Sequence, residues 1–220
     1  MPYNRIYCLL LLLIQLTGCT SNVSRGQVGP NEIFLADKKG QSSDSEQVQS
    51  LLRSLGSTDS RKRAETKTAV LALSNNSFAT RRMILSELIK IAGILCPYTV
   101  ASFRSARWED AVELLGSLKA LESLNVLTHH LDCTTGASLA PDMYPATKAI
   151  IRFGQPAIAA LQIVLKEGRT SERFMAVQAL WAIGGDEAKD AIVRAASIEK
   201  DKHLARMMKD LLGRWKDKKQ

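Results

Sequence analysis

The densest group of side chains able to do chemistry is the run HHLDC at residues 129–133. Imidazole, carboxylate and thiolate groups are common ligands of transition metals. On a helix, His129 and Cys133 would share one face, whereas the adjacent His130 would point elsewhere. The run therefore builds no closed metal site by itself. The alternative is a polar helix end, with histidines near the last carbonyls and Cys133 in a disulfide, and we expect no bound metal or cofactor.

No standard catalytic motif accompanies this cluster. The sequence lacks a glycine-rich phosphate loop, a GxSxG elbow and an HExxH pair. The third histidine, His203, stands alone and is expected on the surface. These observations favour a protein that is not an enzyme.

The N-terminal residues have the layout of a secretory signal. Arg5 precedes an apolar run over residues 6–16, and these 11 residues are too few to cross a bilayer, which takes roughly 20 helical residues. The sequence LTGC at 16–19 then resembles the lipobox of bacterial lipoproteins. The resemblance implies cleavage between Gly18 and Cys19, and lipid on the thiol and amine of Cys19. The alternative is an ordinary signal peptide followed by an incidental cysteine.

A lipidated protein of this kind would be tethered to a membrane, because two or more acyl chains anchor stably. No aspartate follows Cys19, which resembles the outer-membrane sorting pattern of diderm bacteria, with the protein facing the periplasm. We therefore divide the chain into a signal peptide (1–18), a lipidated N-terminus with a flexible tether (19–44), a folded domain (45–216) and a charged tail (217–220).

Export also determines how the four cysteines are interpreted. Cys8 would leave with the signal and Cys19 would take lipid, so that Cys96 and Cys133 remain. In an oxidising compartment, an even remainder favours a disulfide between them. The alternative is two buried thiols.

Composition and periodicity predict an all-α domain. Aromatic residues make up only 5% of the chain, while Ala and Leu are abundant. Apolar residues recur at helical spacing from residue 45 onward, Gly56 ends the first helix, and residues 57–60 offer N-cap side chains for a second helix over 61–73.

A repeating unit is visible in the C-terminal half. AIIRFG at 149–154 aligns with ALWAIG at 179–184 at a shift of 30, and residues 157–161 align with 188–192 at a shift of 31. A fixed period of this size indicates stacked helical hairpins. In the middle of the chain, LLGSLKALESL at 114–124 predicts another helix–glycine–helix transition at Gly116, followed by a longer loop from about 132 to 143. A helix is expected to begin near Arg107.

These hairpins resemble HEAT-like repeats, particularly the short type named after phycobilisome lyases. FGQPAIAAL at 153–161, followed by residues 173–183, is the basis of the likeness, which is good over 146–215, fair over 47–74 and weak between. The resemblance implies an α-solenoid of about four to five irregular hairpins that binds protein along an extended face. Bilin-lyase activity is disfavoured, because those enzymes act on cytoplasmic pigment proteins.

The formal net charge of +8 raises the question of an anionic partner. Superposing the repeats places Lys148, Gln178 and Lys209 in one row, with Arg152 one turn from Lys148 and Arg173 nearby on the next hairpin. This row could meet an acidic partner or an anionic envelope polymer, and the alternative is a solvated outer row. Export makes nucleic acid an unexpected partner.

The sequence thus predicts a lipid-anchored envelope protein whose helical repeat domain is a non-catalytic protein-binding or assembly scaffold. Its expected partners are the membrane, through Cys19, and one or more envelope proteins. The alternative within binding functions is a structural lipoprotein that holds an anionic envelope polymer through its basic face.

Overall fold

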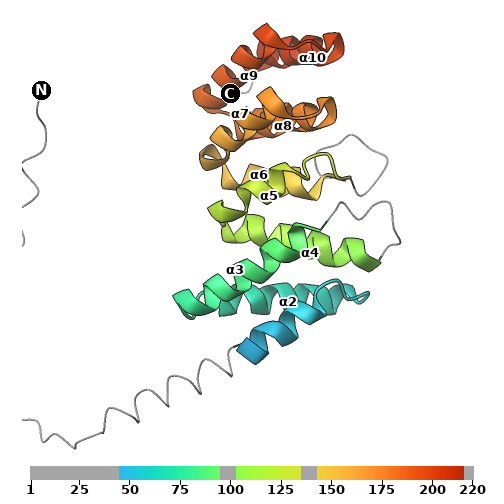
Figure 1. Cartoon of the computed structure of the whole chain (residues 1–220), viewed down its shortest axis with the longest axis vertical. Coiled ribbons are helices and arrows are strands. Elements are labelled where there is room, and N and C mark those ends of the chain that lie inside the picture. Colours follow the sequence, from blue (N-terminus) through green and yellow to red (C-terminus); the bar gives the residue numbers. More distant parts are fainter. Residues whose placement is uncertain (1–44, 95–102, 135–142, 216–220) are drawn as a thin grey trace, which may run out of the picture. The chain divides into compact units, whose positions relative to one another are not determined.

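The computed structural model describes residues 45–94, 103–134 and 143–215 (Figure 1). Within these ranges every regular element is a helix, which confirms the predicted all-α class. A helix over 45–54 is followed by α2 (Ser60–Leu73), α3 (Phe78–Ala92), α4 (Phe103–Leu118), η2 (Leu121–Ser123), α5 (Leu124–Thr128), α6 (Pro145–Phe153), η4 (Gln155–Ala157), α7 (Ile158–Glu167), α8 (Thr170–Ile183), α9 (Gly185–Ile198) and α10 (Lys202–Gly213).

Several predicted features lie outside the described residues. These are the signal sequence, the lipidation site Cys19, the tether, Cys96, the tail, and most of the predicted long loop, of which residues 135–142 are not described. The helix expected to begin near Arg107 begins at Phe103 instead.

The first turn forms where the sequence predicts it. Gly56 has a φ of +77°, in the left-handed region that favours glycine. Asp59 is the N-cap of α2, and its carboxylate accepts hydrogen bonds from the backbone N–H groups of Arg61 at 2.8 Å and Lys62 at 3.2 Å. A short turn therefore joins the helix over 45–54 to α2.

The helices contact one another in two rows. Even-numbered helices form the even row, in which α2 contacts α4, α4 contacts α6, α6 contacts α8 and α8 contacts α10. The odd row runs through α3, α5, α7 and α9 in the same way. Each odd helix also contacts the even helix that follows it, giving the pairs α3–α4, α5–α6, α7–α8 and α9–α10.

Two glycines end equivalent helices of the even row. Gly154 follows α6 with a φ of +69°, and Gly184 follows α8 with a φ of +75°. These are the two glycines that the alignment at a shift of 30 superposes. A side chain would strain this backbone, so the repeated glycine marks the turn between successive helices.

Gly116 has a different role, and the transition predicted there is wrong. Gly116 lies inside α4, which continues to Leu118, and the chain turns at Lys119, whose φ is +48°. A Cβ on Gly116 would lie 2.8 Å from the Cα and Cβ of Ala149 on α6. The glycine is required because α4 and α6 approach closely, and Gly116 is not equivalent to Gly154.

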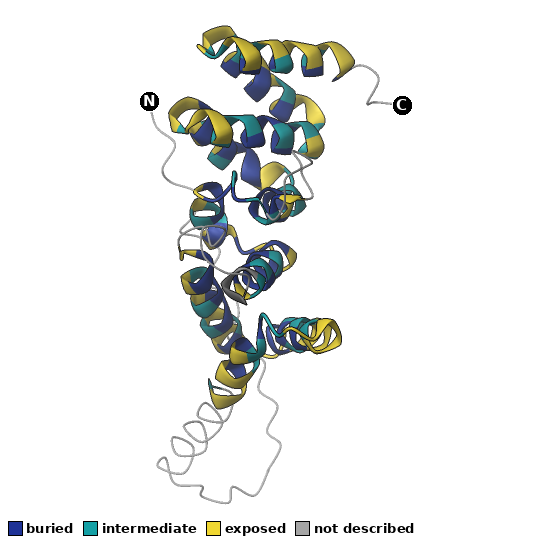
Figure 2. Ribbon diagram, turned by 90° about the vertical axis from the view of Figure 1, so that its right-hand side faces the viewer, coloured by how far each residue is buried: buried dark blue, intermediate teal, exposed yellow. Residues whose placement is uncertain are grey.

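The core lies between the two rows. Buried residues face inward from both rows, as the dark blue segments of Figure 2 show. Large, fully buried side chains come from consecutive helices of both rows: Leu88, Leu114, Leu115, Leu127, Ile150, Leu161 and Leu180. At the end of the described chain, Trp215 is buried. Its ring packs edge to face against that of Trp181, with 4.8 Å between the ring centroids. One continuous apolar core therefore joins all the helix pairs.

Candidate binding surfaces

The predicted basic row lies on three helices that succeed one another in the even row. Lys148 on α6 and Lys209 on α10 are exposed. Gln178, between them on α8, is half-buried, and its amide nitrogen lies 3.6 Å from the sulfur of Met207 on α10. Two of the three side chains are therefore presented to solvent, while the third contacts a neighbouring helix.

Arg152 connects α6 to α4. Its guanidinium donates to the hydroxyl of Ser117 at 3.0 Å and to the backbone carbonyl of Glu113 at 3.3 Å. A guanidinium nitrogen of Arg152 also lies 3.8 Å from a carboxylate oxygen of Glu113, and the arginine side chain is 35% exposed. Arg152 is therefore held by the protein itself, with part of its surface open to a partner.

Arg173 is held in an internal ion pair. Its guanidinium donates to Glu199 at 2.8 and 2.9 Å and to the backbone carbonyl of Gly168 at 2.8 Å. The side chain of Glu199 is only 4% exposed. Burial opposes ionisation of Glu199, but the hydrogen bonds and charge of Arg173, together with the backbone N–H groups of Asp201 and Lys200, lower the pKa of that carboxyl. Arg173 thus ties the start of α8 to the end of α9.

A buried carboxylate joins helices in the first half of the even row. The sequence did not indicate it. The side chain of Asp110 on α4 is fully buried; it accepts from the backbone N–H of Gly56 at 2.9 Å and from Arg63 at 2.8 Å. The ammonium nitrogen of Lys67 lies 3.7 Å from a carboxylate oxygen of Asp110 and 2.6 Å from one of Glu113. Together with Arg152, these side chains link α2, α4 and α6 through alternating charges. Nothing in the spacing of Asp110 distinguishes it from an exposed helix carboxylate, so no sequence signal was available.

The HHLDC run divides into an exposed and a buried part. His129 is exposed directly after α5, and its Nδ1 lies 2.7 Å from the backbone carbonyl oxygen of Asn125 in that helix. His130 is buried with its ring edge-on to Trp108, 5.7 Å between centroids, and its Nδ1 lies 3.7 Å from the sulfur of Cys133. Burial, and secondarily the nearby His129, lower the pKa of His130.

Over the described residues, no group of three His, Cys, Asp or Glu side chains is placed to hold a metal ion. Cys133 is disulfide-bonded. Because Cys96 lies outside the described residues, its pairing with Cys133 stays a prediction.

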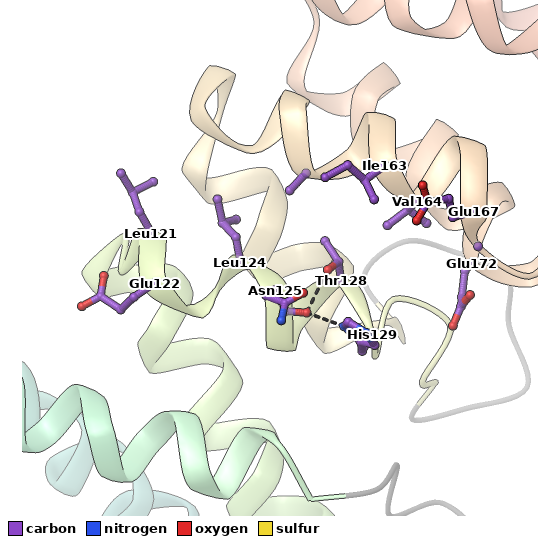
Figure 3. Close-up of a pocket in the computed structure, with 12 residues that line it drawn as sticks. Leu121, Glu122, Leu124, Asn125, Thr128, His129, Ile163, Val164, Glu167 and Glu172 are labelled. Atoms are coloured by element: carbon purple, nitrogen blue, oxygen red, sulfur yellow. Dashed lines mark hydrogen bonds between the residues drawn. The ribbon is translucent and has the colours of Figure 1, made fainter.

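A groove opens on the odd row between η2–α5 and α7 (Figure 3). We call it the α5–α7 groove. It has a volume of about 720 Å³, within the range of roughly 300 to 1,000 Å³ typical of ligand sites. Its lining consists of Leu121, Glu122, Leu124, Asn125, Thr128, His129, Ala160, Ile163, Val164, Glu167, Gly168 and Glu172.

The groove exists because α5 is short. This helix has 5 residues, whereas α3 and α7, its neighbours in the odd row, have 15 and 10. The short helix leaves side chains on both sides of the groove incompletely covered: Leu121 is 55% exposed and Ile163 is 60% exposed. Two large aliphatic side chains therefore stand open to solvent across the groove (Figure 3).

The charged lining of the groove is acidic. It includes Glu122, Glu167 and Glu172 but no Lys or Arg. Glu172 is already paired, since it accepts from the backbone N–H of Arg169 at 2.7 Å and from that guanidinium at 2.8 Å. Burial alone would raise its pKa, but the hydrogen bonds from Arg169 lower it. Glu122 and Glu167 are exposed and supply the remaining negative charge.

No described helix is by itself long and apolar enough to cross a membrane. The segments Pro145–Phe153 and Gln155–Glu167 would meet the requirement only as a pair bent by 118°, and both contribute core residues.

In comparisons with known proteins, no protein-family model matches this sequence, and no curated protein is significantly similar to it.

Proposed function

We propose that this protein is a lipid-anchored, non-catalytic scaffold of the bacterial cell envelope, which binds a partner protein through its helical repeats. The lipid anchor at Cys19 is supported by the apolar run and the LTGC sequence. The binding role is supported by the α5–α7 groove, an open and partly apolar surface on a domain without a standard catalytic motif.

The described helices support a HEAT-like α-solenoid of five short hairpins as the architecture of this scaffold. In such a solenoid each helix contacts its counterparts in the neighbouring repeats, which is the pattern of the even and odd rows. The equivalent glycines after α6 and α8 agree with a repeat of about 30 residues. The unequal lengths of the helices, above all of α5, are why the repeats are irregular.

The groove is the single observation on which the binding role depends most. Monomeric proteins expose isolated apolar side chains routinely, but side chains that flank a groove of this volume mark a recognition surface more strongly. The scaffold would therefore engage its partner on the odd row.

The decisive experiment is crosslinking in living cells of the tagged protein beside its Cys19→Ala variant, with identification of the captured material. We expect one or two envelope proteins to be captured by the wild type, and both membrane retention and palmitate labelling to be lost in the variant. Retention of the Cys19→Ala protein at the membrane would exclude the lipid anchor.

A second candidate function, binding of an anionic envelope polymer, is favoured by the charges of the even row. The helices of the even row carry twelve Lys and Arg against six Asp and Glu, whereas those of the odd row carry six against five. On α10, Lys202, Arg206 and Lys209 are exposed on one helix face. Within the described chain, none of the three lies within ion-pair distance of a carboxylate.

This candidate is tested by reversing charges that the fold does not use. Lys148→Glu combined with Lys209→Glu would abolish capture of an anionic polymer, while Arg152 and Arg173 keep their internal partners. Capture of a protein that is unchanged in this double variant would argue for the α5–α7 groove instead of the basic face.

A further inference from the structure

We propose that the α5–α7 groove binds a short cationic segment of the partner protein, in which one large apolar side chain is flanked by Lys or Arg. This proposal rests on the proposed scaffold function and names the chemistry of what the scaffold recognises. The apolar side chain would lie between Leu121 and Ile163, and the cations beside Glu122 and Glu167.

The apolar part of the argument comes from the two sides of the groove. Leu121 and Leu124 come from η2 and α5, whereas Ala160, Ile163 and Val164 come from α7 (Figure 3). More than half of the surface of Leu121 and Ile163 is exposed although both belong to residue types that usually pack inside. One aliphatic or aromatic side chain placed between them would remove apolar surface from water on both sides at once.

The electrostatic part comes from the contrast between the groove and the rest of the chain. The chain as a whole carries a net charge of +8, yet the lining contains three glutamates and no Lys or Arg. Arg169 neutralises Glu172. Among the described residues, the one cation paired with Glu167 is Lys166, with 3.8 Å between ammonium nitrogen and carboxylate oxygen; both side chains are more than 60% exposed, so this contact is weak. Glu122 and Glu167 therefore favour a cationic occupant and repel an acidic one.

The polar lining argues for a peptide segment rather than a small polar metabolite. The Thr128 hydroxyl donates to the backbone carbonyl of Asn125 at 2.9 Å, and the His129 ring nitrogen lies 2.7 Å from the same oxygen. Among the described residues, no buried side-chain nitrogen or oxygen is left without a hydrogen-bond partner. The groove thus holds no buried polar atom waiting for a ligand, and recognition depends on apolar contact and charge.

The test uses the protein purified from membranes in detergent and a phage-displayed library of random 12-residue peptides. Peptides selected on the wild type are measured by fluorescence anisotropy against two groove variants, Ile163→Ser and the double variant Glu122→Lys with Glu167→Lys. The matched controls are Ile198→Ser, an exposed aliphatic residue outside this groove, and Glu46→Lys with Glu65→Lys, an equal charge change elsewhere. Circular dichroism checks that every variant is folded.

We expect selected peptides to combine an apolar residue with Lys or Arg. Their Kd for each groove variant should be at least tenfold higher than their Kd for the wild type and for the control variants. Binding should also weaken as salt rises from 50 to 300 mM. Selection of acidic peptides, of no peptide above background, or of peptides that bind the groove variants as well as the wild type would overturn the proposal.

Peptide binding by the groove and capture of a partner in cells test the two proposals separately. If the protein partner captured in cells is still captured by both groove variants, the scaffold function stands and the groove proposal fails. If the groove selects cationic apolar peptides but no protein is captured in cells, the peptide site stands and the scaffold function fails.

Discussion

The even and odd rows are assembled from the same helix pairs, yet they expose different chemistry. In the even row, α4 and α6 approach so closely that Gly116 has no room for a Cβ, and the charges of Asp110, Glu113 and Arg152 join neighbouring helices. In the odd row, the short α5 leaves a groove and exposes aliphatic side chains. The comparison teaches that one short helix between two longer neighbours is enough to leave part of a face open.

The largest effect is expected where the even row depends on one buried charge. Asp110→Ala would leave the Gly56 N–H and the partly buried Arg63 without their acceptor, and we expect a loss of about 3 kcal/mol in the free energy of unfolding. Urea unfolding followed by circular dichroism measures this. Glu65→Ala, which removes an exposed pair with Arg61, is the control and should change the value by less than about 0.5 kcal/mol. Equal effects of the two changes would mean that the charge network does not hold the even row together.

The close approach of α4 and α6 should tolerate no added methyl group. Gly116→Ala places a Cβ 2.8 Å from atoms of Ala149, so the helices must separate, at a cost of about 2 kcal/mol. Gly213→Ala at the end of α10 meets nothing within 4 Å and should stabilise by about 0.5 kcal/mol, since alanine favours the helix. A stabilising Gly116→Ala would show that the even row is more loosely packed than its distances indicate.

Acid should weaken the region after α5 through His130. Because burial lowers the pKa of His130, its neutral form is favoured in the folded state. This contribution is complete above the unfolded pKa of about 6.5 and is lost as pH falls below it toward the folded pKa. Unfolding measured at pH 7.5 and 5.5 should show lower stability at pH 5.5, and His130→Asn should flatten this dependence while His203→Asn should not. Glu172 and Glu199, whose pKa values are lowered, contribute changes only below about pH 4.5.

The smallest effect on stability is expected in the groove of the odd row. Ile163→Ala removes a side chain that is 60% exposed, so the free energy of unfolding should change by less than about 0.5 kcal/mol. Thermal unfolding beside the wild type measures this. A loss above about 1 kcal/mol would mean that Ile163 serves the fold, and the contrast between a structural even row and a binding odd row would no longer hold.

Local signals predicted the helical elements well where they are strong. The turn at residues 56–60 and the helix that follows agree with the structure, because a glycine with positive φ and an aspartate N-cap act within a few residues. Gly154 and Gly184 were matched from their shared sequence environment. The prediction for Gly116 is wrong, because a glycine that ends a helix and one that admits a neighbouring helix look alike in sequence.

The candidate surfaces were predicted less completely. Lys148 and Lys209 are exposed on helices of the even row, but Gln178 is half-buried and Arg173 is held by Glu199, which lies 26 residues further along the chain. The α5–α7 groove had no sequence signal, since its two sides come from residues about 40 positions apart. Pairings of this kind depend on how helices stack and not on local spacing.

The amino-acid sequence by itself determined the helical class and the turns at Gly56, Gly154 and Gly184, because capping and helical periodicity act over a few residues. Only the tertiary structure decided that α4 and α6 touch at Gly116, that Asp110 is buried among cations, and that the space beside the short α5 stays open. These features depend on distances between segments far apart in the chain, which local propensity does not encode.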